Sequence, residues 1–284
     1  MSIQSKPIVK VIADSTDIHD NRIITFQLTY WRAIHAEVMT HREFSRNAGS
    51  SRARPSLPII QQVFDNPWGP SHWGTNKKGM QNGEEGDTEY IEACKNAWRE
   101  SARDAASHAK KLYQLGLHKH IVNRVLEPFT SIDVVVTSTS FDNFYGLRIH
   151  DDAAHEIREL ASAMYLHQRA SRPRLLRENE WHLPYVSDEE RETLSTEVAR
   201  KVSAARCARA SYKLFDGTDP SISDDLDLYE RLAGAEPVHA SPLEHQATPL
   251  LGRKEYEHLT GNFNNWIQSR KLHPNEYISH FKLT

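Results

Sequence analysis

The clearest strand in the sequence is the stretch Arg22-Ile23-Ile24-Thr25-Phe26-Gln27-Leu28-Thr29-Tyr30. Its apolar and polar residues largely alternate, which is the period of a strand with one buried face. Residues 31–39 follow directly and place Trp31, Ile34 and Val38 at helical spacing, which predicts a helix. A strand and a helix together form a rigid support, so we expect the loop after them to hold ligand groups in place.

That loop is rich in hydrogen-bond donors. It reads His41-Arg42-Glu43-Phe44-Ser45-Arg46-Asn47-Ala48-Gly49-Ser50-Ser51, and Arg52 and Arg54 come directly after it. The guanidinium group of arginine is a planar fork that matches phosphate oxygens, and serine hydroxyls and loop amides complete such a cradle. The composition is equally compatible with a solvated basic loop, so the choice between the two depends on the rest of the chain.

The remaining sequence predicts several helices and one more strand. The β-branched run Ile132–Thr137 is typical of a buried strand. Amphipathic or helix-favouring patterns predict helices over residues 89–115, 121–126, 151–167, 187–212 and 226–232. Ser187 and Glu190 form a capping-box pattern, and Ser241-Pro242-Leu243-Glu244 repeats it with proline at the first helical position. The polar stretch 67–87 is interpreted as a surface excursion.

The donor-rich loop resembles the signature of a known family. His41-Arg42, followed by seven residues and Ser50, is similar to the Arg-His-Arg-x7-Ser signature of flavin-dependent thymidylate synthases. Arg52 falls at a further arginine position of that family. Thr40 replaces the first arginine of the signature, and the resulting Thr-His-Arg form is most similar to the phage-borne branch of the family.

Four more stretches resemble segments of the same family. They are Asn143–Arg148, which leads into a helix start at Ala153–Leu160; Arg124–Pro128; Ala208–Tyr212; and His239–His245. In the second of these, Glu127 stands where the family has leucine. Together with the signature, the matches span most of residues 21–250.

The order of these segments differs from the common family order. Elsewhere in the family the segments like Ala208–Tyr212 and His239–His245 precede the strand and the signature, whereas here they follow. A circular permutation accounts for this order, and it requires the chain after His245 to lie close to the strand that begins near Arg22. The alternative is that the two carboxyl-terminal matches are fortuitous.

The resemblance implies both a fold and a reaction. The implied fold is an α+β domain over residues 1–284, with an antiparallel-rich central sheet flanked by helices and a circularly permuted order. The implied reaction is the reductive methylation of dUMP to dTMP, with methylenetetrahydrofolate as carbon donor and NADPH as reductant through FAD. This chemistry needs no metal and no protein nucleophile, because the cofactor carries the redox step. The implied assembly is a homotetramer with active sites shared between subunits.

The resemblance also assigns roles to particular residues. Arg148 is the expected catalytic residue, since a guanidinium group stabilises negative charge that develops on the pyrimidine. The expected dUMP-binding residues are Glu37, Ser50, Arg52, Arg124 and Arg148, and the expected FAD-binding residues are His41, Arg42, Asn143, Ser211, His239 and Ser241. We interpret Ser50 as a phosphate ligand rather than a nucleophile, because no His–Asp pair in the sequence obviously activates it.

Two departures from the family leave the nucleotide open. Glu37 stands where the family usually has glutamine, and Ala48 replaces a glutamate. A flavin- and folate-dependent pyrimidine hydroxymethylase or dCMP methylase is therefore the alternative enzyme. A non-catalytic nucleotide- or RNA-binding relative is the alternative of another class.

Composition narrows the possibilities further. The formal net charge of −3 gives no general attraction to nucleic acid, and no apolar run is long enough to span a bilayer. The amino terminus lacks the apolar core of a signal peptide, and Cys94 and Cys207 form no CxxC pair. We therefore expect a cytoplasmic protein with free thiols. If the protein is encoded by a phage, that cytoplasm is the one of the bacterial host. No GxGxxG motif occurs, so the sequence does not support a Rossmann-type site for NADPH. His118-Lys119-His120 lacks the carboxylate or cysteine ligands that would support a zinc site.

Overall fold

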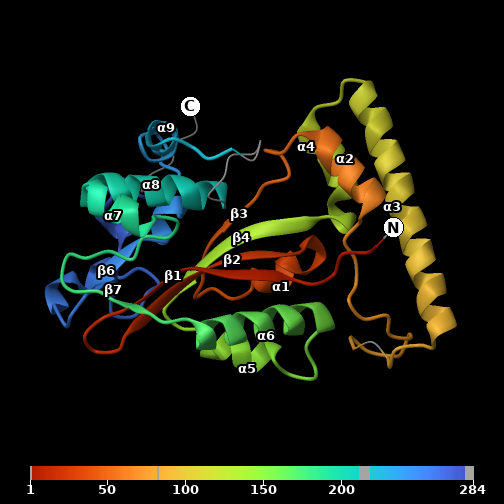
Figure 1. Ribbon diagram of the computed structural model, residues 1–284, viewed down its shortest axis with the longest axis horizontal. Helices are drawn as coiled ribbons and strands as arrows, with labels where there is room; N and C mark the ends of the chain where they lie inside the picture. Colours follow the sequence, from red (N-terminus) through yellow and green to blue (C-terminus); the bar gives the residue numbers. More distant parts are fainter. Residues whose placement is uncertain (1, 82, 211–217, 279–284) are drawn as a thin grey trace.

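The computed structural model describes residues 2–81, 83–210 and 218–278, and its centre is a five-stranded sheet (Figure 1). The strands are β1 (Ile8–Thr16), β2 (Arg22–Trp31), β3 (Ser45–Ala48), β4 (Ser131–Ser138) and β5 (Arg174–Leu175), in the order β3-β4-β2-β1-β5. All neighbouring strands are antiparallel except β1 and β5, which are parallel. The α+β class and the antiparallel-rich sheet are thereby confirmed.

One face of the sheet is apolar and is covered by two helices. Ile24, Phe26, Leu28 and Tyr30 alternate along β2 and are buried, as the sequence pattern predicts. They pack against α5 (Asp142–Arg148) and α6 (His155–Ala170), which lie below the sheet in Figure 1. The predicted inner face of α6 is confirmed, because its buried residues are Ile157, Leu160, Ala161 and Met164.

The opposite face of the sheet carries a buried polar chain. The Thr25 and Thr137 hydroxyls lie 2.7 Å apart across β2 and β4. His182 Nε2 lies 2.8 Å from Thr25 Oγ1, and its Nδ1 lies 2.9 Å from Ser15 Oγ. At the other end, His245 Nδ1 lies 2.8 Å from Thr137 Oγ1. Two histidines from the carboxyl-terminal part of the chain are thus attached to the middle of the sheet.

The carboxyl-terminal part covers this polar face. Its helices are α7 (Asp188–Thr193), α8 (Thr196–Arg209) and α9 (Ile222–Ala233), and its small sheet pairs β6 (Ala247–Pro249) with β7 (Trp266–Gln268). Three 3-10 helices complete it: η3 (Ser241–Glu244), η4 (Lys254–Leu259) and η5 (Ser269–Leu272). Arg206 and Arg209 of α8 both pair with the buried Asp225 of α9, which fixes these two helices against each other.

A separate helical group lies at the other end of the sheet, on the right in Figure 1. It contains α2 (Ser56–Asp65), the long α3 (Thr88–Gln114), α4 (Lys119–Val122) and the 3-10 helix η2 (Asn123–Phe129). Its small core is formed mainly by Ile60, Val63 and Leu126 against a stripe of alanines on α3. The predicted helix over 89–115 is close to α3, whereas the short helix predicted over 121–126 is divided between the end of α4 and the 3-10 helix η2.

Several local expectations were wrong. The helix expected over 187–212 is divided into α7 and α8, because Leu194 is extended (φ −92°, ψ 145°) and Ser195 caps a new helix by accepting from the Val198 amide. The capping box at Ser187 and Glu190 is present. The pattern at Ser241–Glu244 forms only a 3-10 turn without a side-chain cap.

The amino-terminal expectations also need correction at two places. Residues 31–39 form two short helices, η1 (Arg32–Ile34) and α1 (His35–Val38), instead of one. The expected loop after His41 contains β3, which adds an edge to the sheet by pairing with β4. β1 was not anticipated, and it pairs with β2 from Arg22 to Thr29.

The chain after His245 lies beside the start of β2. Asn265 Nδ2 donates to Asn21 Oδ1 at 2.9 Å. Ile23 packs against Ala247, Phe263 and Trp266 in one buried cluster. This proximity is what a circular permutation requires, and the permutation itself stays a prediction. Among the residues that the structure describes, no helix has the length and apolar character needed to cross a bilayer.

The buried histidines make stability depend on pH. Burial lowers the pKa of His182 and of His245 to about 3, below the usual 6.5. The unfolded chain therefore binds protons below pH 6.5 that the folded chain does not bind until about pH 3. We expect the free energy of unfolding to fall, as pH drops through this window, by up to about 1.4 kcal/mol per pH unit for each histidine.

Urea denaturation at pH 7.5, 6.5, 5.5 and 4.5 measures this dependence. The double variant His182→Gln/His245→Gln should be less stable at pH 7.5 but lose stability more slowly on acidification. His167→Gln, which changes an exposed histidine, should keep the wild-type slope. Parallel slopes for the wild type and the double variant would contradict the assignment.

Candidate functional site

Arg148 ends α5 and lies against the segment that follows β2. Its Nε donates to His41 Nε2 at 3.0 Å, and its Nη2 donates to Thr40 Oγ1 at 3.3 Å. Its Nη1 lies 3.7 Å from Glu37 Oε2. Glu37 and His41 from one segment and Arg148 from a distant one therefore lie together, and Thr40 occupies a hydrogen-bonding position beside them.

The His41 ring is held as a neutral acceptor. Burial, followed by the nearby charges of Arg148 and Arg46, lowers the pKa of His41 from its ordinary value. Because Nε2 accepts from Arg148, the ring proton resides on Nδ1. The edge of the ring packs on Phe144, with centroids 4.8 Å apart. His41 thus orients the guanidinium group without opposing its charge.

A cavity of about 730 Å³ opens beside Glu37 and Arg148. One wall comes from the segments 72–81 and 83–85, and another comes from residues 151–155, which lead into α6. His72 stacks on His155 with centroids 3.8 Å apart, and the Ser71 amide donates to Glu156 Oε1 at 3.0 Å. The stretch that the sequence suggested to be a surface excursion is therefore attached to α6 and lines this cavity.

Ser50, Arg52 and Arg124 belong to a second group at the other end of β3. Ser50 and Arg52 are exposed, and the Arg52 amide donates to Ser50 Oγ at 3.3 Å. Arg124 Nη1 lies 4.0 Å from Glu127 Oε2, and the neighbouring Ser51 donates to Glu127 Oε1 at 2.8 Å. Glu127 thereby connects the loop after β3 with the helical turn that carries Arg124.

Arg32 belongs to the same group and was not anticipated. Its Nη1 lies 4.0 Å from Glu127 Oε1, and its Nη2 donates to the Gly49 carbonyl at 3.4 Å. Burial lowers the pKa of Arg32, and Glu127 partly offsets that effect. In the sequence, only its position directly after a predicted strand could have suggested a role for Arg32. The pairing of β3 with β4 is what brings the loop that carries Ser50 close to Arg32.

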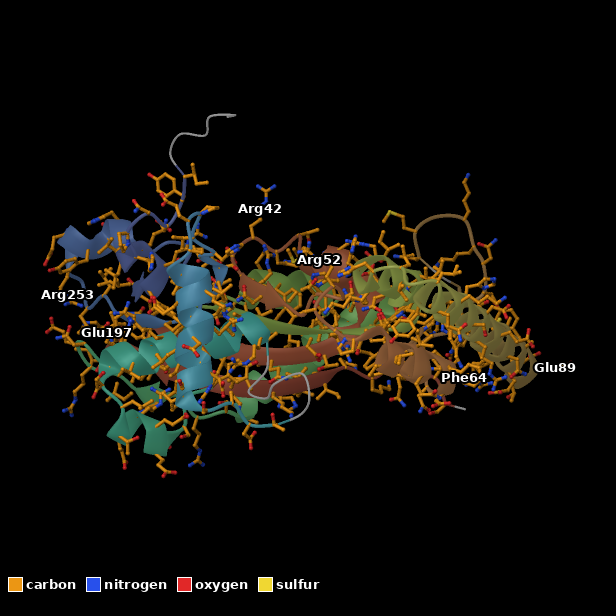
Figure 2. All side chains as sticks on the ribbon, turned by 90° about the horizontal axis from the view of Figure 1, so that it is seen from above. Arg42, Arg52, Phe64, Glu89, Glu197 and Arg253 are labelled. Atoms are coloured by element: carbon orange, nitrogen blue, oxygen red, sulfur yellow. The ribbon has the colours of Figure 1, made fainter. Side chains whose placement is uncertain are left out.

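Arg42 lines a separate cavity of about 720 Å³, which lies between residues 42–46 of the signature and the carboxyl-terminal residues 244–271. Arg46, Arg270 and Lys271 line it with Arg42, and the carboxylates in its wall are those of Glu244 and Glu257. Figure 2 shows the Arg42 side chain projecting away from the ribbon. Arg46 also donates to the His41 carbonyl at 2.7 Å, so this cavity adjoins the Arg148 group.

The other expected FAD-binding residues are less concentrated. Asn143 is exposed in the first turn of α5. His239, just before η3, and Ser241, its first residue, are also exposed. Ser211 lies outside the described residues. No described contact places Asn143, His239 or Ser241 in the Arg42 cavity, so their role stays a prediction.

The pairing of β3 with β4 explains why the expected residues form separate groups. His41 precedes β3 at the end where Ser45 faces Thr137, close to where β4 leads into α5. Ser50 follows β3 at the opposite end. A four-residue strand spans about 13 Å, so the two ends of the signature contribute residues to two separate groups, one around Arg148 and one around Ser50. Among the described residues, no group of histidine, cysteine, aspartate and glutamate is arranged to bind a metal ion.

A family model described as "Thymidylate synthase complementing protein" matches residues 16–174, which is more than half of the chain. The chain belongs to this family. Membership makes it a methyltransferase-type enzyme and argues against the non-catalytic alternative. The matched range contains the signature, the Arg124 and Arg148 segments and the start of α6, whereas the segments at 208–212 and 239–245 lie beyond it.

The chain is also similar to several solved structures, of which the first supports the fold. A UMP/dUMP methylase, PolB from Streptomyces cacaoi, bound with 5-Br UMP, is 17% identical and has a TM-score of 0.50, covering 58% of this chain and 90% of that chain. The same methylase with 5-Br dUMP gives 15% identity and a TM-score of 0.47, covering 58% and 91%. A flavin-dependent thymidylate synthase ThyX from Helicobacter pylori, complexed with FAD and dUMP, gives 14% identity and a TM-score of 0.35, covering 51% and 67%. No curated protein matches the chain.

Proposed function

We propose that this enzyme is a flavin-dependent thymidylate synthase that converts dUMP to dTMP. Methylenetetrahydrofolate would supply the carbon, and NADPH the reducing equivalents through FAD. The observation that carries the proposal is the Arg148 group, in which a neutral histidine and a threonine hydroxyl orient a guanidinium group beside a cavity of about 730 Å³. The Streptomyces cacaoi protein that shares the fold is described as a UMP/dUMP methylase, which supports a pyrimidine nucleotide as substrate.

Arg148 is proposed to act on the pyrimidine ring. Its guanidinium group is already oriented by His41 and Thr40, so little reorganisation is needed when negative charge develops on the base. Glu37 lies close enough to balance the positive charge before substrate binds. A base carbonyl would then replace the carboxylate as the partner of the guanidinium group.

The Arg42 cavity fits the diphosphate of FAD by its donor set. Its lining has four cationic side chains and two carboxylates, and Arg42 is exposed with no partner among the described contacts of its side chain. We assign His41 and Arg42 to this cofactor, with Asn143, Ser211, His239 and Ser241 as further proposed contacts. FAD supplies the hydride transfer, and the protein binds it and orients the nucleotide against it.

Ser50, Arg52 and Arg124 are proposed to hold the nucleotide phosphate. They lie at the opposite end of β3 from His41, so a nucleotide held by Arg148 is not expected to reach the phosphate residues of the same subunit. Active sites that combine Arg148 of one subunit with Ser50 of another remove this difficulty. We therefore keep the homotetramer with shared sites as part of the proposal.

Glu37 favours one alternative substrate. A carboxylate beside the base accepts a hydrogen bond from the exocyclic amino group of cytosine, whereas it is repelled by the O4 carbonyl of uracil. Its proximity to Arg148 thus supports a dCMP methylase or hydroxymethylase as the second candidate.

The decisive assay compares dUMP with dCMP as substrates of the purified protein. We expect a flavin absorbance band before reaction and a product from dUMP that is heavier by a methyl group. Mass spectrometry of the nucleotide product measures this. Turnover of dCMP alone, or a product heavier by a hydroxymethyl group, would replace the main proposal with the second candidate, and a colourless inactive protein would refute both.

Arg148→Ala should lower kcat by at least about 100-fold, because it removes the group that stabilises charge on the base. The flavin absorbance of the purified variant should remain. Arg169→Ala, at an exposed position on α6, is the matched control and should leave kcat unchanged. Wild-type turnover by the Arg148 variant would exclude its catalytic role.

Ser50→Ala should raise KM for dUMP by about tenfold and change kcat much less, since one hydrogen bond to a charged phosphate is lost. Ser101→Ala, on the exposed side of α3, provides the control. Steady-state kinetics separates the two constants. Complete loss of activity at saturating dUMP would instead indicate a nucleophile.

A further inference from the structure

We propose that Glu127 is an internal competitor of the substrate phosphate. Its carboxylate lies between two arginines of the Ser50 group and partly neutralises their charge in the free enzyme, and it loses these contacts when a nucleoside monophosphate binds. The identity of the ligand rests on the proposed function, whereas the anion site itself rests on the contacts below.

Glu127 is the carboxylate on which this group converges. Ser51 donates to its Oε1 at 2.8 Å. Arg32 lies 4.0 Å from Oε1, and Arg124 lies 4.0 Å from Oε2. The hydroxyl is thus within hydrogen-bond distance while both guanidinium groups are beyond it, so the arginines have unused donors.

The surroundings carry excess positive charge. Arg54 is close enough to lower the pKa of Arg32 by its charge, and Lys119 donates to the Ala53 carbonyl at 3.2 Å. Arg52 lies exposed in the same loop. A second carboxylate, that of Asp133, also lies near Arg32, and it accepts a hydrogen bond from Thr29 Oγ1 at 2.6 Å. Glu127 therefore supplies one negative charge to a group that would otherwise attract an anion strongly.

The group is built so that the exchange is possible. Arg124 is 59% exposed, so its side chain is free to turn from Glu127 to a phosphate. A phosphate dianion offers more acceptor oxygens and more charge to a guanidinium fork than a carboxylate does. Asn123 fixes the backbone of the loop by donating to the Ser51 and Arg54 carbonyls, so the loop keeps its shape while the side chains change partners.

The consequence is selectivity for charge. A monophosphate has enough charge to displace Glu127, whereas an uncharged nucleoside leaves the carboxylate in place and gains nothing from the arginines. Affinity for phosphate is reduced in exchange, because each binding event must first break the contacts of Glu127.

Isothermal titration of the full-length protein with inorganic phosphate, dUMP and deoxyuridine tests this at fixed ionic strength. Glu127→Gln removes the charge but keeps an acceptor for Ser51. We expect it to bind phosphate and dUMP about tenfold more tightly and to bind deoxyuridine as the wild type does. Glu127→Leu, which places the residue of the resembled family, should shift both anions in the same direction.

Glu89→Gln is the matched control, because it removes the same charge at the start of α3, far from Arg52 (Figure 2). It should leave all three affinities unchanged. Unchanged or weaker binding of phosphate and dUMP by Glu127→Gln overturns the inference, and so does weaker binding of dUMP alone, because Glu127 would then accept from the sugar instead of competing with the phosphate. Tighter phosphate binding without any dUMP binding supports the anion site and refutes the proposed substrate.

Discussion

The Thr25–Thr137 hydrogen bond lies at the point where the two parts of this protein meet. The two hydroxyls come from adjacent central strands, and each also contacts a histidine from the carboxyl-terminal part. Both histidines are fully buried and neutral, so the two ring nitrogens of His182 and Nδ1 of His245 depend on such partners to offset the cost of leaving water. The carboxyl-terminal part is therefore attached to the sheet by a specific polar pattern.

The same strand pairing places the candidate site. β2 and β4 are paired along their lengths, and β3 adds to the free edge of β4 with Ser45 opposite Thr137. This register puts His41 beside α5, where its ring contacts Phe144 and Arg148. It also puts Ser50 at the opposite end of β4, where Arg124 and Glu127 precede the strand. The separation of the two groups follows from β3 and leads to the proposal of shared subunits.

Part of this arrangement was predictable from the sequence. The alternation along Arg22–Tyr30 and the apolar face of α6 are local periodicities, so they identified β2 and the inner side of the helix. The family resemblance identified Arg148 and the signature. Neither source could reveal β3, because Ser45–Ala48 is short and polar, and its strand conformation depends on the neighbouring edge of β4. Arg32 and the position of Glu127 were missed for the same reason, since both depend on tertiary contacts.

The departures from the family have a common physical effect. Glu37 lies beside Arg148, and Glu127 lies between Arg32 and Arg124, at positions where the resembled family has an uncharged residue. Each proposed substrate-binding group thus contains its own carboxylate, and each arginine exchanges one anionic or acceptor partner for another when a ligand binds. Such an exchange lowers the affinity for every ligand. The loss is largest for a ligand that cannot replace the carboxylate contact that the arginine gives up. Discrimination between nucleotides would then depend on these two glutamates as much as on the arginines they face.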